Sequence, residues 1–162
     1  MVRATVHIDR PLALPAPLDR AWALLSDVPR WGRLFPHVVS VEPFDDPGHP
    51  VGDARPAFVW RMEPLGPPGG RVETVYACRY HTDPDRHTLA WAPIPDVGTA
   101  QFDGACALWA DGARTAGTLR LDATLEIPAP SFVRGIVQPA VALEMSRMTD
   151  VFVGRLREAL AV

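Results

Sequence analysis

The sequence predicts an α+β fold in which an antiparallel sheet packs against one long C-terminal helix. Three observations carry this prediction. Seven segments have the composition or alternation of strands, six of them follow one another with only turns or loops between, and a long helical segment comes last. Consecutive strands joined by short turns pair as a meander. Only the last helix is long enough to cover the dry face of such a sheet, so we expect the core between these two elements.

The composition is that of a globular chain of ordinary domain size. With 162 residues, of which 48% are hydrophobic and 22% charged, we expect one domain over residues 1–162 with a single core. All sixteen basic residues are arginines, scattered among acidic ones, and the net charge is -3. This pattern argues against a nucleic-acid partner. The absence of lysine from the sequence excludes Schiff-base catalysis by a lysine side chain.

The N-terminal residues, the length of apolar runs and the spacing of cysteines and histidines bear on cellular location and cofactors. Residues 1–10 alternate and carry charge, and the longest apolar runs are too short for a membrane span. We therefore expect a cytoplasmic protein without stable membrane insertion. Cys78 and Cys106 fit no zinc or CxxC spacing and are expected to be free, buried thiols. The five histidines show no metal-ligand spacing, so we expect neither a metal nor a cofactor.

The N-terminal elements are a strand and two short helices. Residues 2–9 alternate loosely and predict the strand, which the proline-rich segment 11–17 is expected to end. From about Asp19, apolar residues recur at helical spacing, and Pro29 is expected to stop or kink this helix. A second helical turn is expected at 30–35.

Six more strands are expected at residues 38–44, 55–64, 71–82, 88–94, 99–109 and 115–127. In 71–82, one face carries Tyr76 and Tyr80 and the other carries most of the charged residues, so the tyrosine face is expected to point inward. The last strand alternates cleanly between apolar and charged residues, which is typical of an antiparallel sheet with one covered face. The register of 55–64 is less fixed, because a slip of one residue would exchange Trp60 and Arg61 between the two faces.

The long helix is expected from about Phe132 to near Leu160. Ser131 is a plausible N-cap, and Pro139 is expected to kink or restart the helix. Its apolar stripe consists of Val137, Val141, Met145, Met148, Phe152 and Leu156.

A signature in the segment 21–44 carries a resemblance to a known family. Asp27, Trp31, Phe35 and Pro36 stand in the pattern Asp-x-x-x-Trp-x-x-x-Phe-Pro. With the order of elements, this segment resembles the START-like, helix-grip superfamily, also called SRPBCC, and looks most like its polyketide cyclase/dehydrase and coenzyme-Q-binding branches. The resemblance implies a curved seven-stranded antiparallel sheet wrapped around a long C-terminal helix, with two short helices between the first two strands and a cavity inside.

The same resemblance implies that the two cysteines stay unpaired. In that strand order, Cys78 and Cys106 lie on strands separated by a third strand, roughly 10 Å apart at about 4.8 Å per strand. A disulfide needs closer Cα atoms, so none is expected.

The cavity implied by the fold would be lined by aromatic and methionine side chains suited to a hydrophobic ligand. The alternative is an ordinary filled core without a cavity. The expected ligand-binding residues are Trp60, Met62, Tyr76, Tyr80, Trp91, Phe102, Met145, Met148 and Phe152.

Three residues are candidates for catalysis. An inward Tyr76 would donate to a ligand carbonyl, His37 would act as general acid or base at a pocket entrance, and Arg61 would stabilise an oxyanion if it faced inward. Each has a plainer alternative: a tyrosine bonded to backbone or water, a loop histidine, and a solvated arginine. Glu144 on the last helix either reaches the cavity or forms a surface ion pair with Arg147.

Two functions remain open from the sequence. The first is a protein that binds a lipid, quinone or polyketide-like molecule between the sheet and the last helix. The second is a polyketide cyclase, aromatase or dehydratase that folds its substrate and assists with acid-base chemistry. A dimerising domain with a collapsed cavity is a third possibility. Two or more titratable groups that converge inside would favour the enzyme, whereas outward-facing charged strand residues favour the binder modestly.

Overall fold

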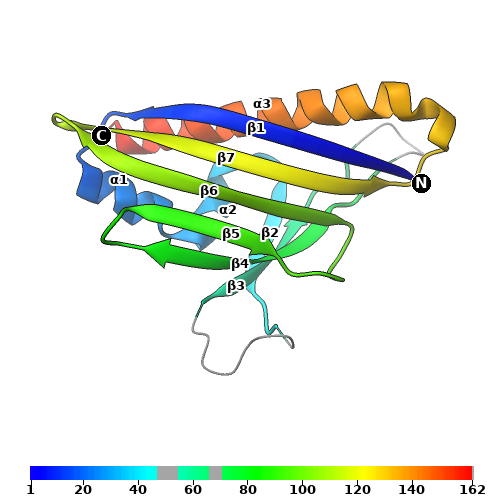
Figure 1. Ribbon diagram of the computed structural model, residues 1–162, viewed down its shortest axis with the longest axis horizontal. Helices are drawn as coiled ribbons and strands as arrows, with labels where there is room; N and C mark the ends of the chain where they lie inside the picture. The colour runs from blue at the N-terminus through cyan, green and yellow to red at the C-terminus, as the bar shows by residue number, and fades with distance from the viewer. Residues whose placement is uncertain (47–54, 66–70, 162) are drawn as a thin grey trace.

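Seven strands form one antiparallel sheet in the computed structural model, which describes residues 1–46, 55–65 and 71–161 (Figure 1). The strand order across the sheet is β1-β7-β6-β5-β4-β3-β2. The strands are β1 (Val2–Leu14), β2 (Val38–Pro43), β3 (Ala57–Met62), β4 (Val75–Asp83), β5 (Thr88–Pro93), β6 (Ala100–Asp111) and β7 (Arg114–Ile127).

The helices are two short ones after the first strand and one long one at the end. They are α1 (Leu18–Leu25), α2 (Val28–Leu34) and α3 (Arg134–Leu160), and a 3-10 turn, η1 (Ser131–Val133), precedes α3. Figure 1 shows α3 running lengthwise along the sheet beside β1, with α1 and α2 near one end of α3. The predicted α+β helix-grip architecture is confirmed in its strand number, its antiparallel pairing and the placement of all three helices.

The first strand is longer than predicted. The proline-rich segment was expected to end the strand near residue 9, but β1 continues through Pro11, which lies opposite Thr118 of β7. The expectation fails because β1 is at the edge of the sheet, where one side of the backbone has no neighbouring strand. A proline without an N–H group is tolerated there.

Three expectations about prolines and caps in the helices also differ from the structure, the third only in part. Pro29 does not end the first helix, which stops at Leu25; it occupies the first turn of α2, where its missing N–H would have no partner in any case. Ser131 makes no capping hydrogen bond and opens the 3-10 turn instead. α3 does not restart at Pro139 but continues through it, since a proline near the helix start removes only one backbone hydrogen bond.

The inner face of the sheet follows the predicted alternation. On β3, Trp60 and Met62 are buried while Arg61 is exposed, which fixes the register that the sequence left open. Cys78 on β4 and Cys106 on β6 are buried and free, with β5 between them, so the prediction of no disulfide is confirmed. Burial raises the pKa of each thiol to about 12, which keeps both protonated at neutral pH.

Candidate functional site

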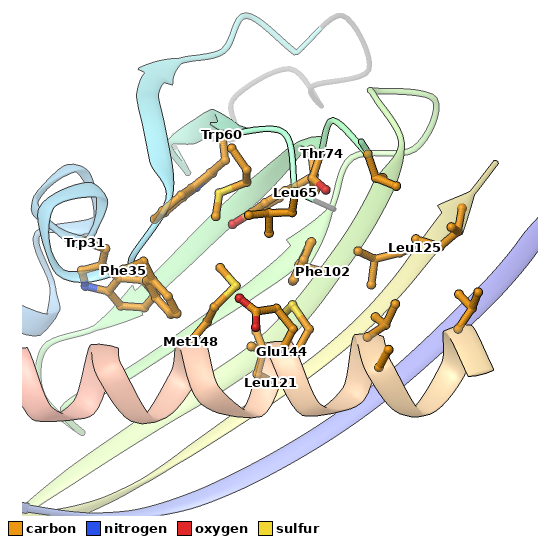
Figure 2. A pocket seen from close by; sticks show the side chains of 18 of the residues that line it. Trp31, Phe35, Trp60, Leu65, Thr74, Phe102, Leu121, Leu125, Glu144 and Met148 are labelled. Atoms are coloured by element: carbon orange, nitrogen blue, oxygen red, sulfur yellow. The ribbon is translucent and has the colours of Figure 1, made fainter. Parts of the chain in front are cut away.

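A cavity of about 510 Å³ lies between the inner face of the sheet and α3 (Figure 2). Strands β3 to β7, helix α2 and the first half of α3 all contribute side chains to it. The aromatic part of its wall consists of Trp31, Phe35, Trp60, Tyr76, Tyr80, Trp91 and Phe102. The aliphatic and methionine part consists of Met62, Leu65, Val72, Leu119, Leu121, Leu125, Ile127, Ile136, Val137, Ala140, Val141, Met145 and Met148.

Ring contacts close one end of the cavity. Phe35 follows α2 and stacks on Phe152 of α3, with ring centroids 4.1 Å apart and planes 9° from parallel. Trp31 meets the edge of Trp91 at 5.4 Å, and its indole N–H donates to the backbone carbonyl of Leu25 at 3.1 Å. The buried indole N–H of Trp31 thus has a hydrogen-bond acceptor, and packed rings fill this end of the cavity. The open space lies toward the N-terminal part of α3, beside residues 136–148.

Two tyrosines on β4 bring hydroxyl groups to the wall. The Tyr80 hydroxyl accepts a hydrogen bond of 2.8 Å from the indole N–H of Trp60. Tyr76 stacks on Trp60 and lies against Phe102 with the two ring planes tilted by 34°, and within the described residues its hydroxyl has no hydrogen-bond partner. Burial raises the pKa of both phenols well above the usual range, so both stay protonated at neutral pH. The protonated Tyr76 phenol is therefore available to donate a hydrogen bond to a bound molecule.

Glu144 and His37 meet at the helix side of the cavity. The Glu144 carboxylate lines the cavity and accepts two hydrogen bonds from Arg147, one of them 3.0 Å from Nε. This pairing lowers the pKa of Glu144, so the carboxylate is ionised. His37 Nε2 lies 4.0 Å from the Glu144 carboxylate and 3.3 Å from Arg147, while Nδ1 lies 3.2 Å from Glu63. An arginine can only donate, so a neutral His37 in this arrangement carries its proton on Nδ1.

Most of the residues that the sequence singled out come together in this cavity. Eight of the nine expected ligand-binding residues line it: Trp60, Met62, Tyr76, Tyr80, Trp91, Phe102, Met145 and Met148.

Three singled-out residues lie elsewhere. Phe152 is fully buried behind Phe35 and is not part of the cavity wall. Arg61 is exposed on the outer face of β3, so no oxyanion in the cavity is within its reach. His37 lies beside Glu144 without lining the cavity.

Sequence reasoning missed part of the wall. Trp31 and Phe35 belong to the family signature, yet nothing in their spacing shows that their rings reach the cavity. Thr74, which shares the tyrosine face of the predicted strand 71–82 by its alternation, is not among the expected ligand-binding residues, yet it lines the cavity. Glu144 was weighed as either a cavity group or a surface ion pair, and in the structure it is both.

A second, polar depression lies on the outer face of the sheet. Its walls include His7 of β1, Asp122 of β7 and Asp103 of β6. His7 Nδ1 lies 2.5 Å from Asp122 and Nε2 lies 2.6 Å from Asp9. The hydrogen bonds to Asp122 and Asp9, in that order, raise the pKa of His7. This cluster ties β1 to β7 on the solvent side.

The described part of the chain carries neither a metal-binding cluster nor a membrane-spanning helix. Its histidine, cysteine, aspartate and glutamate side chains form no group of three that would hold a metal ion. None of its helices combines the length and apolar character needed to cross a membrane.

The sheet, the long helix packed against it and the cavity between them are those of a helix-grip fold. A family model described as polyketide cyclase / dehydrase and lipid transport matches residues 2–161, and the chain belongs to this family. The resemblance drawn from the signature is thereby confirmed for the superfamily and for its polyketide cyclase/dehydrase branch. The description of this family indicates that its members bind hydrophobic small molecules or catalyse cyclase chemistry.

Several solved structures share the fold. The Zhui aromatase/cyclase from a Streptomyces species is 17% identical with a TM-score of 0.65, over 94% of this chain and 93% of that one. The protein TTHA0849 from Thermus thermophilus is 20% identical with a TM-score of 0.64, over 96% and 98%. A STAR-related lipid transfer protein from Xanthomonas axonopodis is 16% identical with a TM-score of 0.61, over 93% and 85%. Among curated proteins, no sequence matches the chain significantly.

Proposed function

We propose that this protein binds a hydrophobic small molecule, such as a lipid, a quinone or a polyketide, in the cavity between the sheet and α3. The observation that carries the proposal is the cavity itself: about 510 Å³ of space whose walls are almost wholly aromatic and aliphatic. Ligand pockets usually enclose about 300–1,000 Å³ and combine apolar walls with a few polar groups that orient the ligand. Membership of a family described by cyclisation, dehydration and lipid transport supports the same proposal.

The polar groups of the cavity suit a ligand with a polar end. Tyr76 brings a hydroxyl to the cavity from β4. Figure 2 shows Thr74 on the sheet side and the Glu144 carboxylate rising from α3. The Tyr80 hydroxyl accepts from the Trp60 indole N–H and also contacts Cys78, whereas the Tyr76 hydroxyl has no hydrogen-bond partner among the described residues. In this proposal the eight lining residues named from the sequence form the apolar contact surface, and Tyr76 anchors a ligand carbonyl or hydroxyl.

The proposal is tested by native mass spectrometry of the purified protein, followed by denaturation and identification of any released molecule. Intrinsic tryptophan fluorescence then follows the binding of added lipids, quinones and aromatic polyketides, because Trp31, Trp60 and Trp91 all line the cavity. Leu121→Trp fills the cavity from β7, and Leu143→Trp makes the same change on the exposed side of α3. Binding that is lost in Leu121→Trp and kept in Leu143→Trp supports the proposal. Equal binding by both variants contradicts it.

A second candidate, a cyclase or dehydratase, is favoured by one observation. A protonated phenol, Tyr76, and an ionised carboxylate, Glu144, line the same cavity, which supplies a hydrogen-bond donor and a proton acceptor to one bound molecule. Affinity and turnover measured on the Tyr76→Phe variant distinguish the two functions. For a binder, the variant weakens affinity by no more than about tenfold, the effect of one neutral hydrogen bond. For an enzyme, turnover of a poly-β-ketone substrate is lost while binding persists.

A further inference from the structure

Glu144 is an acidic side chain in an otherwise apolar cavity wall. It lies on α3 between Val141 and Met145, both of which also line the cavity. Figure 2 shows its carboxylate rising from α3 into the space between the helix and the sheet, with Thr74 on the opposite wall. A side chain at this position contacts whatever occupies the middle of the cavity.

The positive charge that balances Glu144 does not enter the cavity. Arg147 binds the carboxylate through Nε and Nη2 but is itself about half exposed and absent from the lining residues. Among the described lining residues there is no arginine and no histidine. A bound molecule therefore meets the negative partner of the ion pair and not the positive one.

The consequences differ sharply for two kinds of ligand. A carboxylate oxygen has lone pairs left after pairing with Arg147, and a ligand hydroxyl would donate to one of them in a charge-assisted hydrogen bond. A ligand carboxylate would instead bring a second negative charge beside the Glu144 carboxylate, and like charges repel. Its own charge would find no cationic partner among the described residues of the wall.

We infer that Glu144 is a specificity-determining residue, and that the cavity takes neutral hydroxylated molecules, such as phenols and alcohols, and rejects carboxylates. This inference rests on the proposed binding function and narrows its ligand class. Of the three classes named above, it favours phenolic polyketides, reduced quinones and lipid alcohols over fatty acids. Tyr76 and Thr74 on the sheet side would hold a second polar group of the same molecule.

The test compares three probes of one shape: naphthalene, 2-naphthol and 2-naphthoate. Binding is followed by tryptophan fluorescence at a pH where the naphthol is neutral and the naphthoate is ionised. The wild type is expected to bind 2-naphthol at least about tenfold more tightly than 2-naphthoate, since a hydrogen bond to a charged group is gained in one case and repulsion in the other. In Glu144→Gln, which can donate as well as accept, this preference should fall by at least about tenfold.

Two further variants separate a local effect from a general one. Glu158→Gln makes the same change on an exposed position of α3 and should leave the preference unchanged. Arg147→Gln leaves Glu144 unbalanced and should strengthen the rejection of 2-naphthoate. Equal binding of 2-naphthol and 2-naphthoate by the wild type, or an unchanged preference in Glu144→Gln, overturns the inference and leaves hydrophobic binding intact. If the wild type binds none of the probes, naphthalene included, the proposed function falls and the inference falls with it.

Discussion

Replacing Phe152 with alanine is expected to lower the free energy of unfolding by about 3–5 kcal/mol. Phe152 is fully buried, its ring stacks on Phe35 at 4.1 Å, and it lies 5.4 Å from the ring of Trp31. Alanine removes the whole ring and leaves a hole, which the remaining rings are too rigid to fill. Loss of the stacked pair contributes about 0.5–1.5 kcal/mol within that total. For a chain of this length, the melting temperature should fall by roughly 6–20 °C.

The assay is urea unfolding followed by circular dichroism and tryptophan fluorescence, with Met148→Ala as the comparison. Met148 lies one helical turn before Phe152 but faces the open cavity, so it has fewer packing contacts to lose. Its replacement should cost about 2 kcal/mol, at the low end for a buried methionine. If Phe152→Ala costs less than Met148→Ala, or less than about 1 kcal/mol, the distinction between packed core and cavity wall along α3 is refuted.

Three further predictions concern single groups. Tyr76→Phe should leave thermal stability unchanged and weaken ligand affinity by at most about tenfold, measured by fluorescence titration. Cys78 and Cys106 should resist a thiol reagent at pH 8 in the native protein and react on unfolding, because their pKa is raised to about 12; fast native reaction would contradict their burial. Because the pKa of His7 is raised in the folded protein, protonated His7 stabilises the fold. This contribution to the free energy of unfolding is fully present below pH 6.5, the unfolded-state value, and is lost as the pH rises through the higher folded-state pKa. His7→Asn should flatten this part of the pH profile in urea unfolding, and an unchanged profile would exclude His7 as its source.

Much of the architecture follows from alternation in the sequence. β7 and β4 each have one apolar face and one face that carries most of the charge, and burying the apolar face decides which way every side chain points. Tyr76 therefore faces inward as predicted, whereas the side of Trp60 was left open by the sequence and is settled by its burial in the structure. The long helix α3 packs the apolar stripe of its surface over that buried face of the sheet.

What the sequence left undecided depends on contacts between distant segments. Pro11 is compatible with a strand only because β1 is an edge strand, and strand order is a property of the whole sheet. Phe152 and Met148 belong to one helical stripe, and their different surroundings come from Phe35, which arrives from another part of the chain. Glu144 has two roles because the cavity opens beside its ion pair with Arg147.

The pairing of β1 with β7 also determines which parts of the sheet can form first during folding. Val2 lies opposite Ile127, and among the described strands β1 pairs only with β7, so this pairing cannot form until more than a hundred residues have been made. Such distant pairings fold slowly, typically in milliseconds to seconds. During synthesis the apolar faces of β4 to β6 are complete before either β7 or α3 leaves the ribosome. The nascent chain therefore exposes its future binding surface until the last helix covers it, and chaperones are expected to act in that interval.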